Sequence, residues 1–370
     1  MNKRQRARST DRGAKSKMRR AKSKVYGFCF LLVALSSLLC ALPLQARVTG
    51  SCSNCHTMHN SQGGQPVARG DAPWGSTGGL TDAIPSLLIA SCLGCHSSTV
   101  SNESIREFGS NKIPIVFNTA GYPANPLAGG NFFSVSADVD NAGHNVLSSN
   151  PDNTLGDVPP GGSFPSGGSY TGQLRCSGTR GCHGHNGGQS GDSAIDDETS
   201  AIKGAHHGSD TPPLNGDLSD VARNYRFLLG IAGREDSDWE QETSIGHNEY
   251  KGDTNFGASN TISYLCGECH GNFHSDAGVG SVSPWLRHPT DILLPLTGEF
   301  ASYDPTTTYN NLAPVAFMDF DNPSRATAVV MCLSCHRAHA SPWFKMTRWD
   351  YKGWPGSGTN GCSVCHTSKD

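Results

Sequence analysis

The cysteines constrain this chain more than any other feature of its sequence. Twelve of its fourteen cysteines fall into six pairs, and a histidine follows each pair directly. Five of the six motifs read C-x-x-C-H, whereas a random chain of this composition would contain about 0.02 of them. In chain order the motifs are Cys52, Cys55 and His56; Cys92, Cys95 and His96; Cys176, Cys182 and His183; Cys266, Cys269 and His270; Cys332, Cys335 and His336; and Cys362, Cys365 and His366.

This spacing is the attachment signature of haem c. Residues three and four positions apart share one face of a helical turn, so two thiols can bond the vinyl groups of one haem while the next imidazole meets its iron. Disulfides would need no histidine after every second cysteine, and zinc ribbons rarely repeat one ligand set six times in an exported chain. We therefore predict covalently bound haem c at the five regular motifs.

The third motif, CSGTRGCH, has five residues between its cysteines. A regular helix would place Cys176 and Cys182 on different faces, so the segment must bulge, and Gly178 and Gly181 would permit a bulge. The alternative is a disulfide between the two cysteines, with His183 uninvolved. Because the other five cysteine pairs after residue 46 all follow the haem pattern, we favour a haem here too, which makes six.

The N-terminus predicts export. A basic region precedes an apolar run, residues 28–44, that is short for a membrane span and leads into LQA, as signal peptides do. We predict a signal peptide over residues 1–46 and a single elongated multihaem domain over residues 47–370, with no membrane span in the mature chain. Eleven of the 29 basic residues and one of the 32 acidic residues lie before residue 47, which leaves the mature chain at about −13 and argues against a nucleic-acid partner.

The composition is poor for a conventional protein core. Of 370 residues, 44 are glycine and 21 proline, and only 36% are hydrophobic. We expect an irregular, coil-dominated multihaem cytochrome c with short helices, in which a stacked chain of haems serves as the core. One short helix is predicted over residues 217–230, from an Asp cap to Gly230.

Nine histidines lie outside the six motifs and could supply second iron ligands. A haem with two imidazoles has no open position and suits electron transfer, although any one of these histidines could instead be an ordinary surface residue. His59 and His339 each come three residues after a motif histidine, which predicts that they face a neighbouring haem. In the AHH string we favour His207 over His206, and His274 could instead line the edge of a haem. The candidate second ligands are His59, His144, His207, His247, His274, His288 and His339.

Several longer strings resemble a known family. CSNCHTMHNSQGG, CLSCHRAHASPWFKMTR and the terminal CSVCHTSKD are similar to the outer-surface hexahaem cytochrome S family of metal-reducing bacteria. That family polymerises into filaments with a continuous haem chain that carries electrons to external acceptors. The third motif departs from the family, whose third site is an ordinary C-x-x-C-H, and residues 187–261 have no counterpart.

The resemblance implies a specific joint between subunits. In the family, the histidine at the position of His59 leaves its own subunit and binds the fifth haem of the next, here the haem on Cys332, Cys335 and His336. Such a head-to-tail contact produces an open filament when its rotation does not close. The implied partners are further copies of this chain and other redox proteins or extracellular metal acceptors, and the implied location is extracellular or at the cell surface.

Together these features predict a six-haem electron conductor without catalytic activity of its own. The first alternative is a monomeric periplasmic carrier, in which His59 would bind an iron of its own chain. A multihaem reductase is the other alternative, but such enzymes need an open iron, often with a lysine as proximal ligand, and the chain contains no C-x-x-C-K.

Overall fold

The computed structural model describes most of the chain from residue 92 onward and a few residues before it. The chain divides into two units, residues 1–45 and 46–370, and every described residue belongs to the second. The predicted signal peptide lies outside the described residues. In the part that the structure describes, no helix is long and apolar enough to cross a membrane. The described residues are 56, 61–62, 65–66, 92–108, 111–136, 142–146, 159–161, 174–178, 181–184, 202, 206, 225–228, 230–241, 246–275, 288–353 and 360–368.

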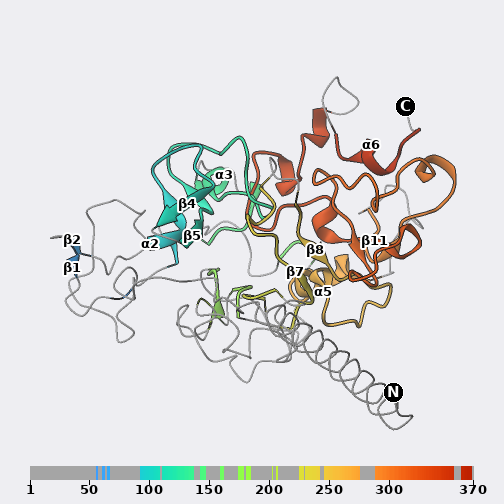
Figure 1. Ribbon diagram of the computed structural model, residues 1–370, viewed down its shortest axis with the longest axis horizontal. Helices are drawn as coiled ribbons and strands as arrows, with labels where there is room; N and C mark the ends of the chain where they lie inside the picture. Colours follow the sequence, from blue (N-terminus) through green and yellow to red (C-terminus); the bar gives the residue numbers. More distant parts are fainter. Residues whose placement is uncertain are drawn as a thin grey trace, which may run out of the picture. The chain divides into compact units, whose positions relative to one another are not determined.

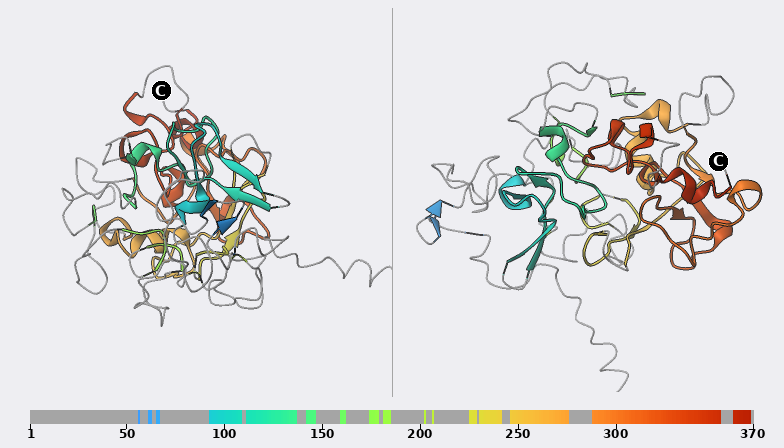
Figure 2. Two further views of the ribbon diagram at one scale, coloured as in Figure 1. Left: turned by 90° about the vertical axis from the view of Figure 1, so that its left-hand side faces the viewer. Right: turned by 90° about the horizontal axis from the view of Figure 1, so that it is seen from above.

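Regular secondary structure is sparse in these ranges, and long stretches of coil connect the elements (Figures 1 and 2). Among the described residues, the longest helix has six residues, Ile262–Gly267, and the hydroxyl of the preceding Thr261 caps it by accepting a hydrogen bond from the Tyr264 amide at 3.1 Å. The coil-rich fold predicted from composition is confirmed. The helices are α2 (Leu93–His96), α3 (Phe133–Ser136), α5 (Ile262–Gly267), α6 (Cys362–Cys365) and the 3-10 turns η7 (Gly271–Phe273), η8 (Gly298–Phe300), η9 (Arg325–Thr327), η10 (Cys332–Ser334), η11 (Phe344–Met346) and η12 (Tyr351–Gly353).

The described strands are two to four residues long and form five small sheets. Four of these sheets have two strands: β1 (Ser61–Gln62) with β2 (Gln65–Pro66), β3 (Ser97–Ser98) with β6 (Phe117–Asn118), β4 (Ile105–Phe108) with β5 (Asn111–Pro114), and β7 (Gly233–Arg234) with β8 (Glu249–Tyr250). The fifth has the order β10–β11–β9, from Ala316–Phe317, Ala328–Val330 and Ile292–Leu293. Among the described strand pairs, only β3 and β6 run parallel.

Strand β11 organises the larger part of the apolar core. Its residues alternate between two clusters: Val329 packs in one with Met331 and Leu333, while Ala328 and Val330 pack in the other. The chain then continues directly into η10, which carries the fifth cysteine motif. The core therefore fixes the position of that motif through buried neighbours on both sides of it.

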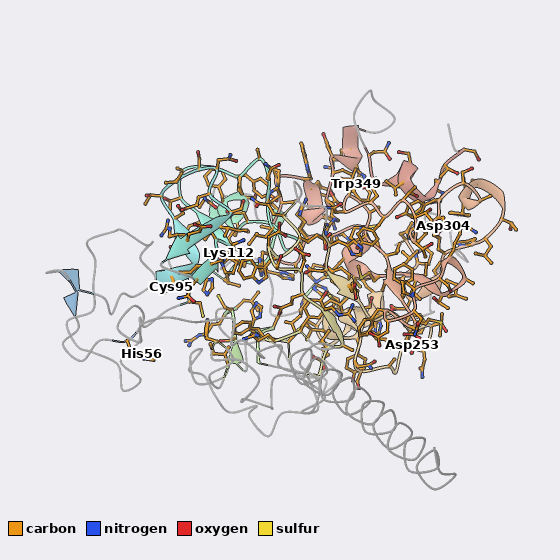
Figure 3. The ribbon with its side chains drawn as sticks, in the orientation of Figure 1. His56, Cys95, Lys112, Asp253, Asp304 and Trp349 are labelled. Carbon is orange, nitrogen blue, oxygen red and sulfur yellow. The ribbon has the colours of Figure 1, made fainter. Side chains whose placement is uncertain are left out.

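A third, smaller cluster joins distant parts of the chain. Leu93 of α2 packs there with Phe117 of β6, Phe132 and Ala340. Figure 3 shows Cys95 of α2 beside the β4–β5 hairpin that carries Lys112. The second cysteine motif is thus held between this hairpin and a segment that follows the fifth motif.

The helix predicted over residues 217–230 is wrong in its described part. The Tyr225 amide donates to the Ile231 carbonyl at 3.0 Å, and the Ile231 amide donates to the Leu228 carbonyl at 3.2 Å, so the chain turns instead of continuing a helix. The Arg226 amide bonds the Glu235 carboxylate at 3.0 Å. Burial of Tyr225 and Ile231 in the core outweighs the local helical preference of the string.

Candidate haem-binding sites

The four regular motifs that the structure describes in full adopt the same local fold. Each forms a single helical turn, at α2, at the end of α5, at η10 and at α6. In each, the histidine amide donates a hydrogen bond to the carbonyl of the first cysteine. This arrangement brings the two thiols and the following imidazole onto one face of the turn, as predicted. The bonds are His96 to Cys92 at 2.9 Å, His270 to Cys266 at 2.9 Å, His336 to Cys332 at 3.1 Å and His366 to Cys362 at 2.9 Å.

The third motif makes the same closing bond in spite of its longer spacing. The His183 amide donates to the Cys176 carbonyl at 3.0 Å. Gly178, inside the motif, has a φ of 83°, in the left-handed region that glycine adopts without strain. The bulge predicted from the sequence is present. Of the first motif the structure describes only His56, so Cys52 and Cys55 lie outside the described residues.

Backbone carbonyls fix the tautomer of several histidines. The Nδ1 atoms of His96, His144 and His270 lie 2.7–2.8 Å from the carbonyl oxygens of Pro114, Ala338 and Pro160. An imidazole that donates from Nδ1 keeps the lone pair of Nε2 available for a metal ion. His336 and His288 make the same kind of contact at 2.9 Å, with the carbonyls of Lys345 and Pro289.

Four motif histidines each face a second histidine, and the distance between the two ring centres is similar in all four pairs. A metal–imidazole bond is about 2.0–2.1 Å long, so two such bonds plus the distance from each nitrogen to its ring centre separate the centres by about 6 Å. The observed separations match this geometry, and each pair could therefore hold one iron between two imidazoles. The pairs are His96 with His206 at 6.2 Å, His144 with His270 at 6.0 Å, His183 with His339 at 6.3 Å, and His288 with His366 at 6.2 Å.

Burial keeps many of these imidazoles neutral. It lowers the pKa of His183 to about 4 and that of His339 to about 3, and it also lowers the pKa values of His96, His144 and His336. An imidazole must be neutral at one nitrogen to bind a metal ion. The electrostatic environment therefore favours the form that an iron requires.

One stretch, residues 338–341, positions two of the facing histidines at once; we call it the crossing segment. It lies between residues 129–131 and residues 142–144. The His339 amide donates to the Gly129 carbonyl at 2.7 Å, and the His339 carbonyl accepts from the His144 amide at 3.0 Å. His339 and His144 are thus neighbours in space, although they face different motif histidines.

The remaining candidate histidines have other surroundings. The ring of His247 stacks on that of Tyr309 with centres 3.6 Å apart, and His274 Nε2 lies 3.2 Å from the buried Asp291 carboxylate. His59 and His207 lie outside the described residues. We favoured His207 over His206 from the sequence, but the structure places His206 opposite His96 and against Phe227. Adjacent side chains point in different directions, so the choice between the two matters.

Consecutive motifs also lie next to one another through their cysteines. The Cys266 and Cys332 thiols hydrogen-bond, which raises the pKa of Cys266 and lowers that of Cys332. The pKa of Cys182 is raised, with a contribution from the Cys269 thiol of the fourth motif. Burial raises the pKa of Cys335 to about 12, with contributions from the cysteines of the sixth motif. Motifs three to six therefore follow each other in space as in sequence.

One functional contact could not be found by reading the sequence. His366 Nδ1 lies 3.0 Å from the Glu299 carboxylate, whereas its counterparts in the second, fourth and fifth motifs meet backbone carbonyls. Glu299 is far from His366 in the chain and belongs to no motif. No signal in the sequence connects the two residues.

Comparison with known proteins agrees with these features. Residues 325–370, which contain the fifth and sixth motifs, match the family model of the doubled CXXCH motif. The chain is 27% identical to the C-type cytochrome OmcS of Geobacter sulfurreducens, over 86% of this chain and 84% of that protein. These two matches confirm the resemblance to cytochrome S that the sequence predicted.

Two solved structures are also similar. One is an Outer Membrane Cytochrome S filament from Geobacter sulfurreducens, with a TM-score of 0.44, and the other, determined by cryo-EM, is of OmcS nanowires from the same organism, with a TM-score of 0.40. Both are 22% identical to this chain, and each alignment covers 83% of this chain and 85% of the other.

Proposed function

We propose that this chain is an exported six-haem c-type cytochrome that conducts electrons along a stacked chain of haems. The observation that carries the proposal is the set of four histidine pairs separated by 6.0–6.3 Å, each of which includes one motif histidine. Two cysteines and a proximal histidine would hold each haem, and the facing histidine would bind the other side of its iron. The haem supplies the one-electron chemistry when bound.

The residues of the chain then determine how electrons pass. The Cys266–Cys332 hydrogen bond, and the electrostatic interactions of Cys182 with Cys269 and of Cys335 with the cysteines of the sixth motif, support a row of haems three to six. Phe227 contacts both His183 and His206, which extends the row to the second haem. Burial of the ligands excludes water and keeps the change in solvation on electron transfer small.

Two imidazoles on an iron leave no position for a substrate. For the second, third, fourth and sixth haems, the facing histidines would occupy that position. This arrangement supports electron transfer and argues against a reductase, as the absence of a C-x-x-C-K motif does.

The proposal includes polymerisation through His59. Among the described residues, His336 of the fifth motif faces no other histidine ring at the separation that the four pairs share, and a ligand from a neighbouring copy would complete its iron. His339 offers a precedent within the chain: like His59 it comes three residues after a motif histidine, and it faces His183 of the third motif instead of its own. The cytochrome S family that the sequence resembles forms filaments by such a bond.

A monomeric periplasmic carrier remains the alternative function. In that case His59 would bind an iron of its own chain, and size-exclusion chromatography would show one monomer-sized species at every concentration. If the chain forms a filament, chromatography should show large assemblies, and these should be lost when His59 is replaced.

Substitution of His59 tests the filament directly. In the variant His59→Ala, we expect six covalent haems by intact mass, no fibres in negative-stain images, and a new high-spin signal in the electron paramagnetic resonance spectrum from one haem. Asn60→Ala, which changes the neighbouring residue without removing a histidine, is the matched control and should form fibres. Fibres of unchanged shape from His59→Ala would exclude this joint.

A further inference from the structure

The third motif poses a question that the other motifs do not. Five residues separate Cys176 and Cys182, and the two competing interpretations are a haem attachment site and a structural disulfide. The structure describes Cys176–Gly178 and Gly181–Gly184, which include both cysteines and His183. The two cysteines are not joined by a disulfide.

We propose that this segment is a covalent haem c site of expanded spacing, in which the residues between the cysteines are extruded and His339 binds the far side of the iron. The proposal rests on the proposed function, because it assigns the third haem of the same row. It adds an attachment geometry that differs from the C-x-x-C-H of the family.

The backbone of the motif closes as if the extra residues were absent. The amides of Cys182 and His183 both donate to the Cys176 carbonyl, at 3.2 and 3.0 Å. In the second motif the amides of Cys95 and His96 donate to the Cys92 carbonyl at 3.1 and 2.9 Å. Cys182 and His183 thus take the places of the second cysteine and the histidine of a regular motif.

The two glycines between the cysteines make backbone hydrogen bonds within the motif. The Gly178 amide donates to the His183 carbonyl at 3.1 Å, and the Gly181 amide donates to the Gly178 carbonyl at 3.1 Å. Gly178 has a φ of 83°, and a Cβ atom at Gly181 would collide with the backbone of Cys176 and Ser177. This backbone conformation therefore requires glycine at both Gly178 and Gly181.

His183 is also placed as an iron ligand would be. Its ring centre lies 6.3 Å from that of His339, close to the 6.0–6.2 Å of the other three pairs. Phe132 packs on His339 with ring centres 4.8 Å apart, and Phe227 meets the edge of His183 at 6.3 Å. A disulfide between the cysteines would not require a second buried histidine opposite His183.

Attachment at this site needs no oxidant. Each cysteine thiol adds across one vinyl group: its S–H bond breaks, a carbon–sulfur bond forms, and the hydrogen goes to the neighbouring vinyl carbon. A disulfide would instead release two electrons and two protons to an oxidant. The two outcomes therefore differ in mass as well as in cofactor content.

Mass spectrometry of the intact, purified protein with peptide mapping distinguishes them. We expect six haem additions, one of them on the peptide that contains Cys176 and Cys182. Five additions, with that peptide two hydrogens lighter, would overturn this proposal and the haem count of six, while the proposed electron transfer through the haems of the five regular motifs would stand. A lack of haem at the regular motifs would instead refute the proposed function.

Two variants test the extruded loop. Gly181→Ala should reduce the count to five haems, because the added Cβ collides with the closing turn. Deletion of Thr179, Arg180 and Gly181 leaves Cys-Ser-Gly-Cys-His and should keep six. If the deletion variant carries five haems while the other motifs are filled, the loop is not a simple extrusion and the proposed geometry fails.

The ligand is tested separately. His339→Ala should keep six haems but convert one from low spin to high spin in the electron paramagnetic resonance spectrum. His274→Ala is the matched control, because His274 also follows a motif histidine closely but pairs with Asp291; we expect its spectrum to stay low spin. An unchanged spectrum in His339→Ala would exclude this residue as the ligand.

Discussion

A histidine that binds iron through Nε2 owes part of its donor strength to the group that its Nδ1–H meets. The Nδ1 atoms of three motif histidines, His96, His270 and His336, hydrogen-bond to backbone carbonyls, whereas His366 Nδ1 lies 3.0 Å from the Glu299 carboxylate. Glu299 is itself anchored, because its carbonyl accepts the Thr367 amide at 2.8 Å. A carboxylate this close favours positive charge on the imidazole and its iron electrostatically, more than a neutral carbonyl does, which stabilises the ferric state.

Substitution of Glu299 should therefore raise the potential of one haem. We expect Glu299→Gln to shift one midpoint upward by tens of millivolts, since a tenfold change in relative affinity corresponds to about 59 mV for one electron. Spectroelectrochemical titration would resolve the shift. Glu107→Gln, which removes a similar charge from an exposed position in β4, is the control. A downward shift of the haem at the sixth motif would contradict this explanation.

At the scale of elements, the position of the crossing segment depends on close backbone contacts with Gly130 and Asn131. Gly130 has a φ of 81°, and a Cβ atom there would collide with the Ala340 carbonyl. The Asn131 amide donates to that same carbonyl at 3.1 Å. Because this segment carries His339 and contacts His144, a displacement would disturb the proposed ligands of two haems at once.

The variant Gly130→Ala should show this double effect. The left-handed backbone alone costs about 1–3 kcal/mol, and the collision adds to it. We expect a lower midpoint in chemical denaturation together with new high-spin signals from two haems. Gly298→Ala is the control, since Gly298 also has a positive φ, 67°, but nothing lies near its added Cβ. If both variants respond alike, backbone strain and not the crossing segment explains the loss.

How far the sequence could predict the site depends on how far apart in the chain the interacting residues are. The attachment turns are local and follow from spacing, and the bulge at Gly178 follows from the three residues that the third motif has beyond a regular C-x-x-C-H. The assignment of His339 to a haem other than its own followed from its position three residues after His336. The partners themselves could not be predicted: nothing local separates His206 from His207, and burial of Tyr225 overrode the helical pattern of its string.

For the whole molecule, the described apolar core is small. It consists of clusters of eight, seven and five buried residues, two of which share strand β11. Coil connects them, and several of its turns end on ligand histidines. Small cores rarely stabilise chains of this length, so covalently bound haems would have to supply much of the buried apolar surface.

A chain without haem should therefore fail to fold cooperatively. In a variant with alanine at all twelve motif cysteines, we expect weak circular dichroism, binding of a hydrophobic dye, and no sigmoidal transition in urea. The haem-loaded protein from the same host is the comparison. A cooperative transition in the haem-free chain would show that side chains alone suffice for the core.

The four histidine pairs also affect whether the fragments stay connected after the polypeptide is cleaved. With the proposed ligation, each haem is bonded to one segment through its cysteines and to a distant segment through its iron. The spans from His96 to His206, His144 to His270, His183 to His339 and His288 to His366 overlap, so any single cut between His96 and His366 falls inside at least one of them. A protease that nicks a loop would leave the fragments fastened together and the row of redox centres unbroken.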